Sequence, residues 1–258
     1  MTVQPWLEVT RGKAPLVVSL PHTGTEIPDR IEWRLVTPGL GRMDTAWRLH
    51  TLHAFAAELG ATTVRTRVSR TVVDVDRDPM SSALVPTTTL DGVELYKHGE
   101  GIGGAETAQR RAAWYDPYHA ALAAELSRLR ARHGRVVLWD AHSIRSRVPR
   151  LFPGELPLLN LGTDGGATCD PVLRDALRAG CEASGLSWSV DGPFKAGWTT
   201  RHHANVAESV HAVRLTLAQR GYMDEDRPGA WEPARAASVQ DVLRRLLEAA
   251  LAWTRRGT

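Results

Sequence analysis

Two short apolar runs, each leading into a polar segment that contains histidine, constrain this fold more than any other feature. Residues 16–20 (LVVSL) stop at Pro21, and residues 135–139 (RVVLW) lead directly into DAHS. Short apolar runs bounded by turn formers are typical of strands that are buried on both faces. We therefore predict that these two runs are central strands of a sheet.

The rest of the chain alternates between strand-like and helix-like patterns. We expect further strands at 62–68 (extended by 71–75 after a bend), 158–161 and 211–217, and a long loop at 77–104. Helices are expected at 44–59 with Asp44 as its cap, at 105–133 with a break at Pro117, at 170–184, and at 238–255 with Ser238 as its cap. This alternation predicts a mostly parallel sheet covered by helices on both sides. No internal repeat or linker divides the chain, so residues 1–258 are expected to form one domain.

Composition and charge exclude several classes of function. The net charge of +3 comes from Arg residues that are scattered among Asp and Glu, which does not favour nucleic-acid binding. No apolar run is long enough to span a membrane, and the first residues lack the pattern of a signal peptide, so a cytoplasmic location is expected. The two cysteines, Cys169 and Cys181, are expected to be buried thiols. The G-x-S-x-G motif of serine hydrolases and the phosphate-binding P-loop are both missing from the sequence.

Two histidines follow the predicted central strands. His22 lies two residues after the first run, and His142 lies shortly after the second run, two residues beyond Asp140. In a parallel sheet such positions meet at the carboxyl edge, where ligands bind. Imidazole is a preferred zinc ligand, so His22 and His142 are predicted to hold one metal ion. If the strand continues, Asp140 and His142 point to the same face, and Asp140 either binds the metal or orients His142.

The third metal ligand is predicted to be a carboxylate. Asp44 is preferred, at the start of an expected helix. Glu26, on the same loop as His22, and Asp140 are the alternatives.

Several Arg residues are candidates for binding a substrate carboxylate, because the guanidinium fork matches that group. Arg70 and Arg77 lie in an apolar segment rich in Asp, where internal Arg–Asp pairing is the alternative. Thr200 and Arg201 belong to a segment (FKAGWTTRHH) that is typical of a substrate loop, and Arg145 follows the DAHS motif. In that loop, metal binding is an alternative role for His202 and for His203, although a surface position is favoured for His203. Among the remaining histidines, which are expected to be structural or exposed, His119 is the strongest candidate for a functional role.

Taken together, these segments resemble the N-formylglutamate amidohydrolase family. The resemblance runs from about residue 15 to residue 223 and is carried by these strings: PLVVSLPHTGTEIP, SRTVVDVDRDP, YDPYHAAL, VVLWDAHSIRSRVPRLFPGELPLLNLGT, CDP and FKAGWTTRH.

The resemblance implies a fold and a reaction. It implies a three-layer α/β/α sandwich with a mixed, mostly parallel sheet, similar to that of zinc carboxypeptidases. It also implies a zinc-dependent amidohydrolase that cleaves the N-formyl or other N-acyl amide of an acidic amino acid, with His22 and His142 as metal ligands. Asp76 and Arg77 fall where relatives carry an Asn-Arg pair that resembles a carboxylate clamp.

Three segments of the chain depart from the family pattern. Relatives read roughly H-A-V-Q-L-E where this chain has residues 211–216 (HAVRLT), so Thr216 replaces a Glu that resembles the general base. Asp76 replaces the Asn, and residues 203–206 replace a Tyr-Gly-Arg-Pro-like run. Because a hydroxyl is too weak a base, Glu208, Asp140 or Asp76 is expected to substitute for the lost Glu. The alternative is a homologue that keeps its metal but has a binding or regulatory role with little turnover.

Overall fold

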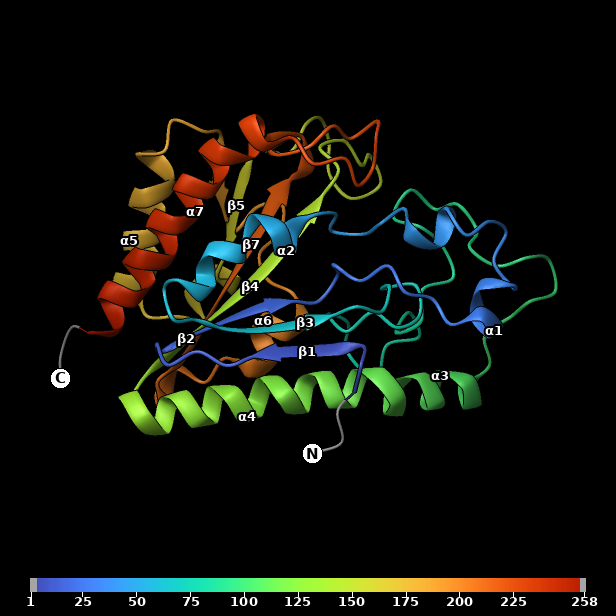
Figure 1. Cartoon of the computed structure of the whole chain (residues 1–258), viewed down its shortest axis with the longest axis horizontal. Coiled ribbons are helices and arrows are strands. Elements are labelled where there is room, and N and C mark those ends of the chain that lie inside the picture. The colour runs from blue at the N-terminus through green and yellow to red at the C-terminus, as the bar shows by residue number, and fades with distance from the viewer. Residues whose placement is uncertain (1–3, 256–258) are drawn as a thin grey trace.

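The computed structural model describes residues 4–255 and contains one mixed seven-stranded sheet (Figure 1). The strand order is β1-β3-β2-β4-β7-β5-β6. Only the β1–β3 and β5–β7 pairs are antiparallel among the described pairs, which matches the predicted mixed, mostly parallel sheet. The strands are β1 (Leu7–Thr10), β2 (Leu16–Leu20), β3 (Thr62–Thr66), β4 (Val136–Ile144), β5 (Leu159–Gly162), β6 (Trp188–Val190) and β7 (Val210–Ala218).

Helices cover both faces of the sheet. In Figure 1 the long helix α4 (Asp116–His133) runs beneath the sheet, while α7 (Pro233–Thr254) and α5 (Pro171–Glu182) lie on the opposite side. The short helices α6 (Trp198–His203) and α2 (Leu49–Leu52) pack against the sheet beside α4 and α7 respectively. This is the predicted three-layer α/β/α arrangement. Two further helices, α1 (Asp29–Glu32) and α3 (Gly104–Arg110), lie away from the central strands, on the right of Figure 1.

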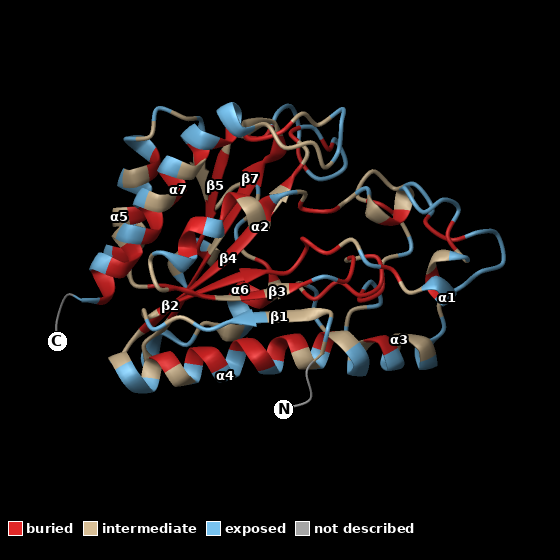
Figure 2. Cartoon of the chain, viewed as in Figure 1, coloured by how far each residue is buried: buried red, intermediate tan, exposed pale blue. Residues whose placement is uncertain are grey.

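The central strands are buried on both faces because successive side chains of a strand point in opposite directions. On β2, Leu16 and Val18 join the core under α5 and α7, whereas Val17 joins the core under α4. β4 divides its side chains in the same way. Figure 2 shows the resulting band of buried residues between the helical layers. Each buried aliphatic side chain contributes about 1.5–3 kcal/mol relative to exposure, so an unbroken apolar run stabilises a strand only in this two-sided position.

Most predicted strands are confirmed, with β4 and β7 continuing beyond their apolar segments. The predicted strand at residues 71–75 is wrong. These residues form turns, because the Ser69 hydroxyl accepts a hydrogen bond from the Thr71 amide and the Ser69 carbonyl accepts one from Val72. The predicted long loop at 77–104 is confirmed up to the start of α3.

The predicted helix at 44–59 is wrong as a continuous element. Arg48 adopts a left-handed conformation (φ 56°), which limits helix to α2 and a 3-10 turn at Ala54–Ala57. The expected break at Pro117 is also wrong, since Pro117 occupies the first turn of α4, where proline is tolerated, after a π-helical turn at Arg111–Tyr115. The last helix begins at Pro233, before the predicted cap Ser238. Strands β1 and β6 and helix α6 were not predicted.

No helix among residues 4–255 is long and apolar enough to cross a lipid bilayer.

Candidate functional site

A pocket of about 350 Å³ lies at the carboxyl ends of the central strands. Strands β4 and β7 form part of its wall. The loop after β2, the segment after β3, the start of α6 and residues of other loops form the rest of it. This is the edge at which parallel sheets bind ligands, and it is where the two predicted histidines were expected to meet.

The structure brings His22 and His142 together in this pocket. Their ring centroids are 5.2 Å apart with an interplanar angle of 69°, and both side chains are largely buried. His22 follows the end of β2, where its carbonyl oxygen accepts a hydrogen bond from the amide of Ala46. His142 is part of β4 itself, so the strand fixes its direction. The convergence that the sequence predicted is therefore present.

A buried aspartate orients His22. Nε2 of His22 lies 2.8 Å from Oδ1 of Asp74, and the other carboxylate oxygen of Asp74 is 2.6 Å from Nη2 of Arg70. Burial alone would raise the pKa of Asp74, but the charges of Arg70 and His22 hold it well below its usual value. Burial lowers the pKa of His22, and Asp74 only partly offsets this effect. The internal Arg–Asp pairing considered for this segment is thus present at Arg70.

Two more aspartates lie next to His142. Its Nε2 is 3.0 Å from Oδ2 of Asp140 and 3.8 Å from Oδ2 of Asp76, and one ligand atom from each of the three residues lies within 4.8 Å of the others. Yet this nitrogen is buried and has no aligned hydrogen-bond partner among residues 4–255. A buried nitrogen without a hydrogen bond, facing two carboxylates, fits a divalent cation.

Each of these carboxylates is held in place. Asp140 is fully buried and accepts hydrogen bonds from the hydroxyls of Ser19 (3.0 Å) and Thr200 (2.9 Å). Burial would raise the pKa of Asp140, but His142 and Arg214 together lower it below its usual range. Asp76 accepts from the amide of Thr199 at 2.9 Å and pairs with Nη1 of Arg214 at 2.5 Å. Carboxylates that bind metals are commonly fixed in this way.

The predicted third ligand, Asp44, lines the pocket but does not join these groups. Its carboxylate accepts a hydrogen bond from the Leu90 amide at 2.8 Å and lies 3.4 Å from Nη2 of Arg145. Within the described residues, no group of three ligand atoms within 4.8 Å includes Asp44 or His22. Glu26, the alternative ligand, pairs with Arg67 and is about half exposed, outside the pocket.

The predicted substrate-binding arginines differ in how many donors they have left. Arg70 is committed to Asp74, and Arg145 is committed to Asp44 and Asp91. Arg77 and Arg201 line the same pocket with exposed side chains. Arg77 makes only a 3.5 Å contact with Asp74, and Arg201 donates to the carbonyl of Ala196. Thr200 is buried beneath the pocket, where it holds Asp140.

Of the predicted catalytic residues, Thr216 and Asp140 lie at the site and Glu208 does not. Thr216 lines the pocket directly beside His142 in the β4–β7 register, and its hydroxyl accepts from Nε of Arg214 at 3.1 Å. Glu208 pairs with Arg130 on a separate groove between α4 and α6. The structure thus leaves Glu208 out of reach of the pocket.

Sequence reasoning did not assign roles to Asp74, Arg214 or Ser19. Asp74 could have been singled out as a carboxylate in the apolar run 71–75, because a buried charge needs a partner. Arg214 in β7 carries the same signal. Ser19 gives no such signal, since its hydroxyl carries no charge.

The family of the chain is shown by comparisons with known proteins. The model of the N-formylglutamate amidohydrolase family matches residues 14–223. Two relatives, both N-formylglutamate deformylases, come from Pseudomonas aeruginosa and Pseudomonas putida. The first is 43% identical over 96% of this chain and 97% of its own length; the second is 42% identical over 96% of each.

Solved structures show the same fold. An N-formylglutamate amidohydrolase from Ralstonia eutropha superposes with a TM-score of 0.85 at 23% identity, covering 98% of this chain and 99% of the other. A gene product from Agrobacterium tumefaciens superposes with a TM-score of 0.74 at 20% identity, covering 96% and 94%. The family model and the two deformylase relatives show that this chain belongs to the N-formylglutamate amidohydrolase family.

Proposed function

We propose that this protein hydrolyses the formamide bond of N-formylglutamate, or of a closely related N-acyl amino acid, with the help of one divalent metal ion. The observation that carries the proposal is the convergence of His22 and His142 in one pocket, with the carboxylates of Asp74, Asp76 and Asp140 next to the two rings. Two relatives at more than 40% identity carry the name of the deformylase activity.

The residues of the pocket fit a zinc ion. We propose that His22 and His142 supply the nitrogen ligands. The carboxylate ligand would come from Asp140 or Asp76, which lie beside His142, instead of the Asp44 favoured by the sequence. A metal ion bound there would supply Lewis acidity to the formyl carbonyl and to a water molecule.

The protein's own side chains would bind and orient the substrate. N-formylglutamate carries two carboxylates, and Arg77 and Arg201 line the pocket with exposed guanidinium groups that can receive them. Arg70 keeps Asp74 ionised, and Asp74 in turn fixes the direction of the His22 ring. The apolar side chains of Ile144, which is buried, and Phe194, which is half-buried, line the pocket and would limit access of bulk water to the reacting amide.

The leaving amine needs a proton, and an acidic side chain must carry it. Asp76 is the better placed carboxylate for this role, because it is closer to solvent than the fully buried Asp140. Asp76 also pairs with Arg214, which holds its carboxylate at the wall of the pocket.

A substrate panel tests this function. The chain should release formate from N-formylglutamate far faster than from N-formylalanine, which lacks the side-chain carboxylate. The variant Arg77→Gln should raise KM for N-formylglutamate by about 10- to 100-fold, because a hydrogen bond to a charged group contributes about 1.5–3 kcal/mol. Arg132→Gln, on the exposed side of α4, is the matched control and should change nothing.

One observation favours a second function. Thr216 cannot act as a base although it lies beside His142, so the chain would instead be a binding or regulatory protein that retains its metal. Tight binding of N-acyl amino acids across the panel without any release of formate or acid would support this alternative and contradict hydrolysis.

A further inference from the structure

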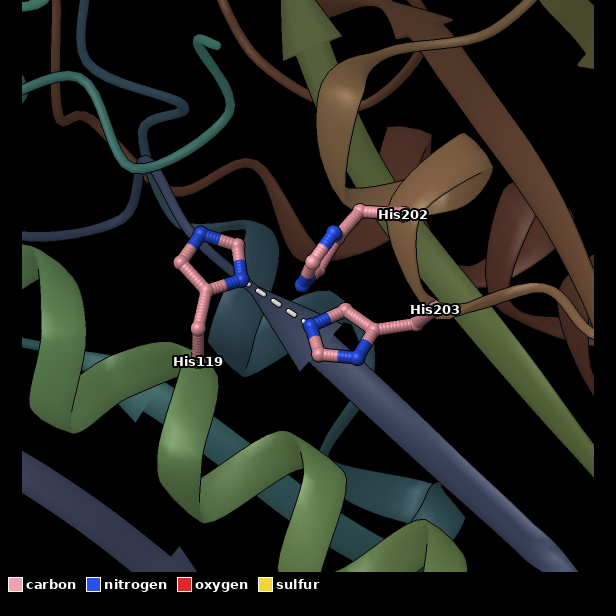
Figure 3. Close-up of side chains that lie close together, drawn as sticks. All are labelled: His119, His202 and His203. Atoms are coloured by element: carbon pink, nitrogen blue, oxygen red, sulfur yellow. Dashed lines mark hydrogen bonds between the residues drawn. The ribbon is translucent and has the colours of Figure 1, made fainter. Parts of the chain in front are cut away.

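Three histidines gather outside the catalytic pocket, in the groove between α4 and α6. His119 projects from α4, and His202 and His203 end α6. One ligand atom from each lies within 4.8 Å of the other two. Figure 3 shows the three rings around a common gap, with one nitrogen of His202 directed toward the contact between the other two.

The hydrogen bonds of His119 fix which of its nitrogens faces the gap. Nε2 of His119 lies 2.8 Å from the carbonyl oxygen of Val75, which can only accept, so Nε2 carries the proton. Nδ1 therefore has a free lone pair and lies 2.9 Å from Nε2 of His203, which donates to it. A histidine that binds a metal usually donates its other ring N–H to a carbonyl or carboxylate in this manner.

At least two of the imidazoles are neutral, which is the form that binds metals. Burial lowers the pKa of His119 to about 4, and burial together with the neighbouring His119 and His202 lowers that of His203 to about 3. At neutral pH, protons therefore do not compete with a cation for these two rings.

We propose that His119, His202 and His203 form a second metal site that takes a zinc ion or a similar divalent transition metal. His119 binds through Nδ1 and His203 through Nε2, and the fourth position opens to the groove. When the lone pair of Nε2 of His203 is taken up by the ion, the proton that Nε2 carried moves to Nδ1 of the same ring, so no net proton is released. Neutral nitrogen donors select zinc, copper, nickel or cobalt over magnesium and calcium.

An ion at this site connects elements that shape the catalytic pocket. It joins α4 to α6, and through His119 it also restrains the carbonyl of Val75, which lies between Asp74 and Asp76. The first turns of α6 hold Asp76 through the amide of Thr199 and Asp140 through the hydroxyl of Thr200. The second ion thus has a positioning role and does not touch the substrate.

Metal counting on the full chain tests the site. The metal-free protein is titrated with Zn²⁺ by calorimetry and with Co²⁺ by visible absorption. The wild type is compared with the double variant His202→Asn/His203→Phe. The control is His98→Asn, because His98 is exposed and lies outside this cluster. The double variant should bind one equivalent less than the wild type and lose one Co²⁺ absorption component. That component should persist in His142→Asn and in His98→Asn.

A ligand exchange keeps the test decisive if the double variant folds poorly. His203→Cys should bind as many equivalents of metal as the wild type and add a thiolate-to-Co²⁺ charge-transfer band. Equal stoichiometry in the wild type and the double variant, or Co²⁺ binding to His203→Cys without that band, would overturn the proposal. The readout is bound metal, so it does not depend on whether the chain hydrolyses N-formylglutamate.

Discussion

At the scale of single residues, Asp76, Arg214 and Thr216 form one connected group. Arg214 pairs with Asp76 and donates to Thr216, and β7 places Arg214 beside Asp140 and Thr216 beside His142. From the resemblance of the sequence, we expect relatives to carry Asn, Gln and Glu at these positions. An acid at position 76 and a cation at position 214 compensate each other's charge, because a buried charge without its partner is strongly destabilising. The departures therefore act together on one wall of the pocket.

Restoring a carboxylate at position 216 should increase activity. In Thr216→Glu, the new side chain would enter the pocket beside His142 and could pass a proton to the leaving amine. We expect kcat/KM for formate release to rise by about 100-fold or more, within the ~10²–10⁴-fold range of general acid–base catalysis. Thr216→Gln has nearly the same shape but transfers no proton. Equal rates for the Glu and Gln variants would refute the idea that a base is missing.

At the scale of elements, the position of α6 against the pocket depends on Gly197, the residue before its first turn. The first helical turns supply Thr199 and Thr200 to the two aspartates beside His142. For this to happen the chain must pass very close to the Asp76–Arg214 pair. A β-carbon at position 197 would lie 2.1 Å from Nη1 of Arg214 and 2.2 Å from Oδ2 of Asp76. Glycine is the residue that allows this approach.

Gly197→Ala should therefore reduce activity more than stability. The added methyl group would separate Asp76 from Arg214 and displace the start of α6, and we expect kcat/KM to fall by at least about 100-fold, as small misplacements of a site can. Gly101→Ala is the matched control, since its β-carbon would meet no atom within 4 Å. Steady-state kinetics and thermal unfolding of both variants decide the point; wild-type kinetics in Gly197→Ala would contradict it.

What the sequence revealed also differs between elements. The runs at 16–20 and 135–139 predicted β2, β4 and the position of both histidines, since burial on two faces demands apolar residues throughout. Short elements such as α6 were missed because their stability comes from tertiary contacts, which leave little periodicity. The predicted helix at 44–59 failed at Arg48, whose left-handed backbone has no signal in its side chain. For Asp74, the pairing with Arg70 lies within one segment and was considered, but the contact with His22 crosses the fold and cannot be read from that segment.

At the scale of the whole molecule, the sheet separates two large hydrophobic cores. Burial in these layers also changes the pH at which buried histidines take up a proton. His53 is buried in the layer of α2, where its Nδ1 donates to the carbonyl of Leu49 at 3.0 Å. Burial lowers the pKa of His53 to about 4 from its usual value of 6.5. The sheet shared by both layers favours cooperative unfolding, as expected for the single domain predicted for residues 1–258.

His53 should make the protein less stable in mild acid. The unfolded chain takes up a proton near pH 6.5 but the folded chain only near pH 4, so the free energy of unfolding falls as the pH drops between these values, by up to about 1.4 kcal/mol per unit. His53→Asn keeps a donor near Leu49 but does not titrate. Urea unfolding should show the stability difference between wild type and variant shrinking from pH 7 to pH 4.5. A constant difference would mean that His53 is not the group responsible.

The account depends most on a metal ion shared by His22 and His142. Formate release from N-formylglutamate should be measured for the chelator-treated protein before and after one equivalent of Zn²⁺ is restored, with His142→Asn in parallel. We expect removal of the metal to lower the rate at least about 100-fold, zinc to restore it in the wild type, and no recovery in the variant. Full activity in protein shown to be free of metal would contradict the account.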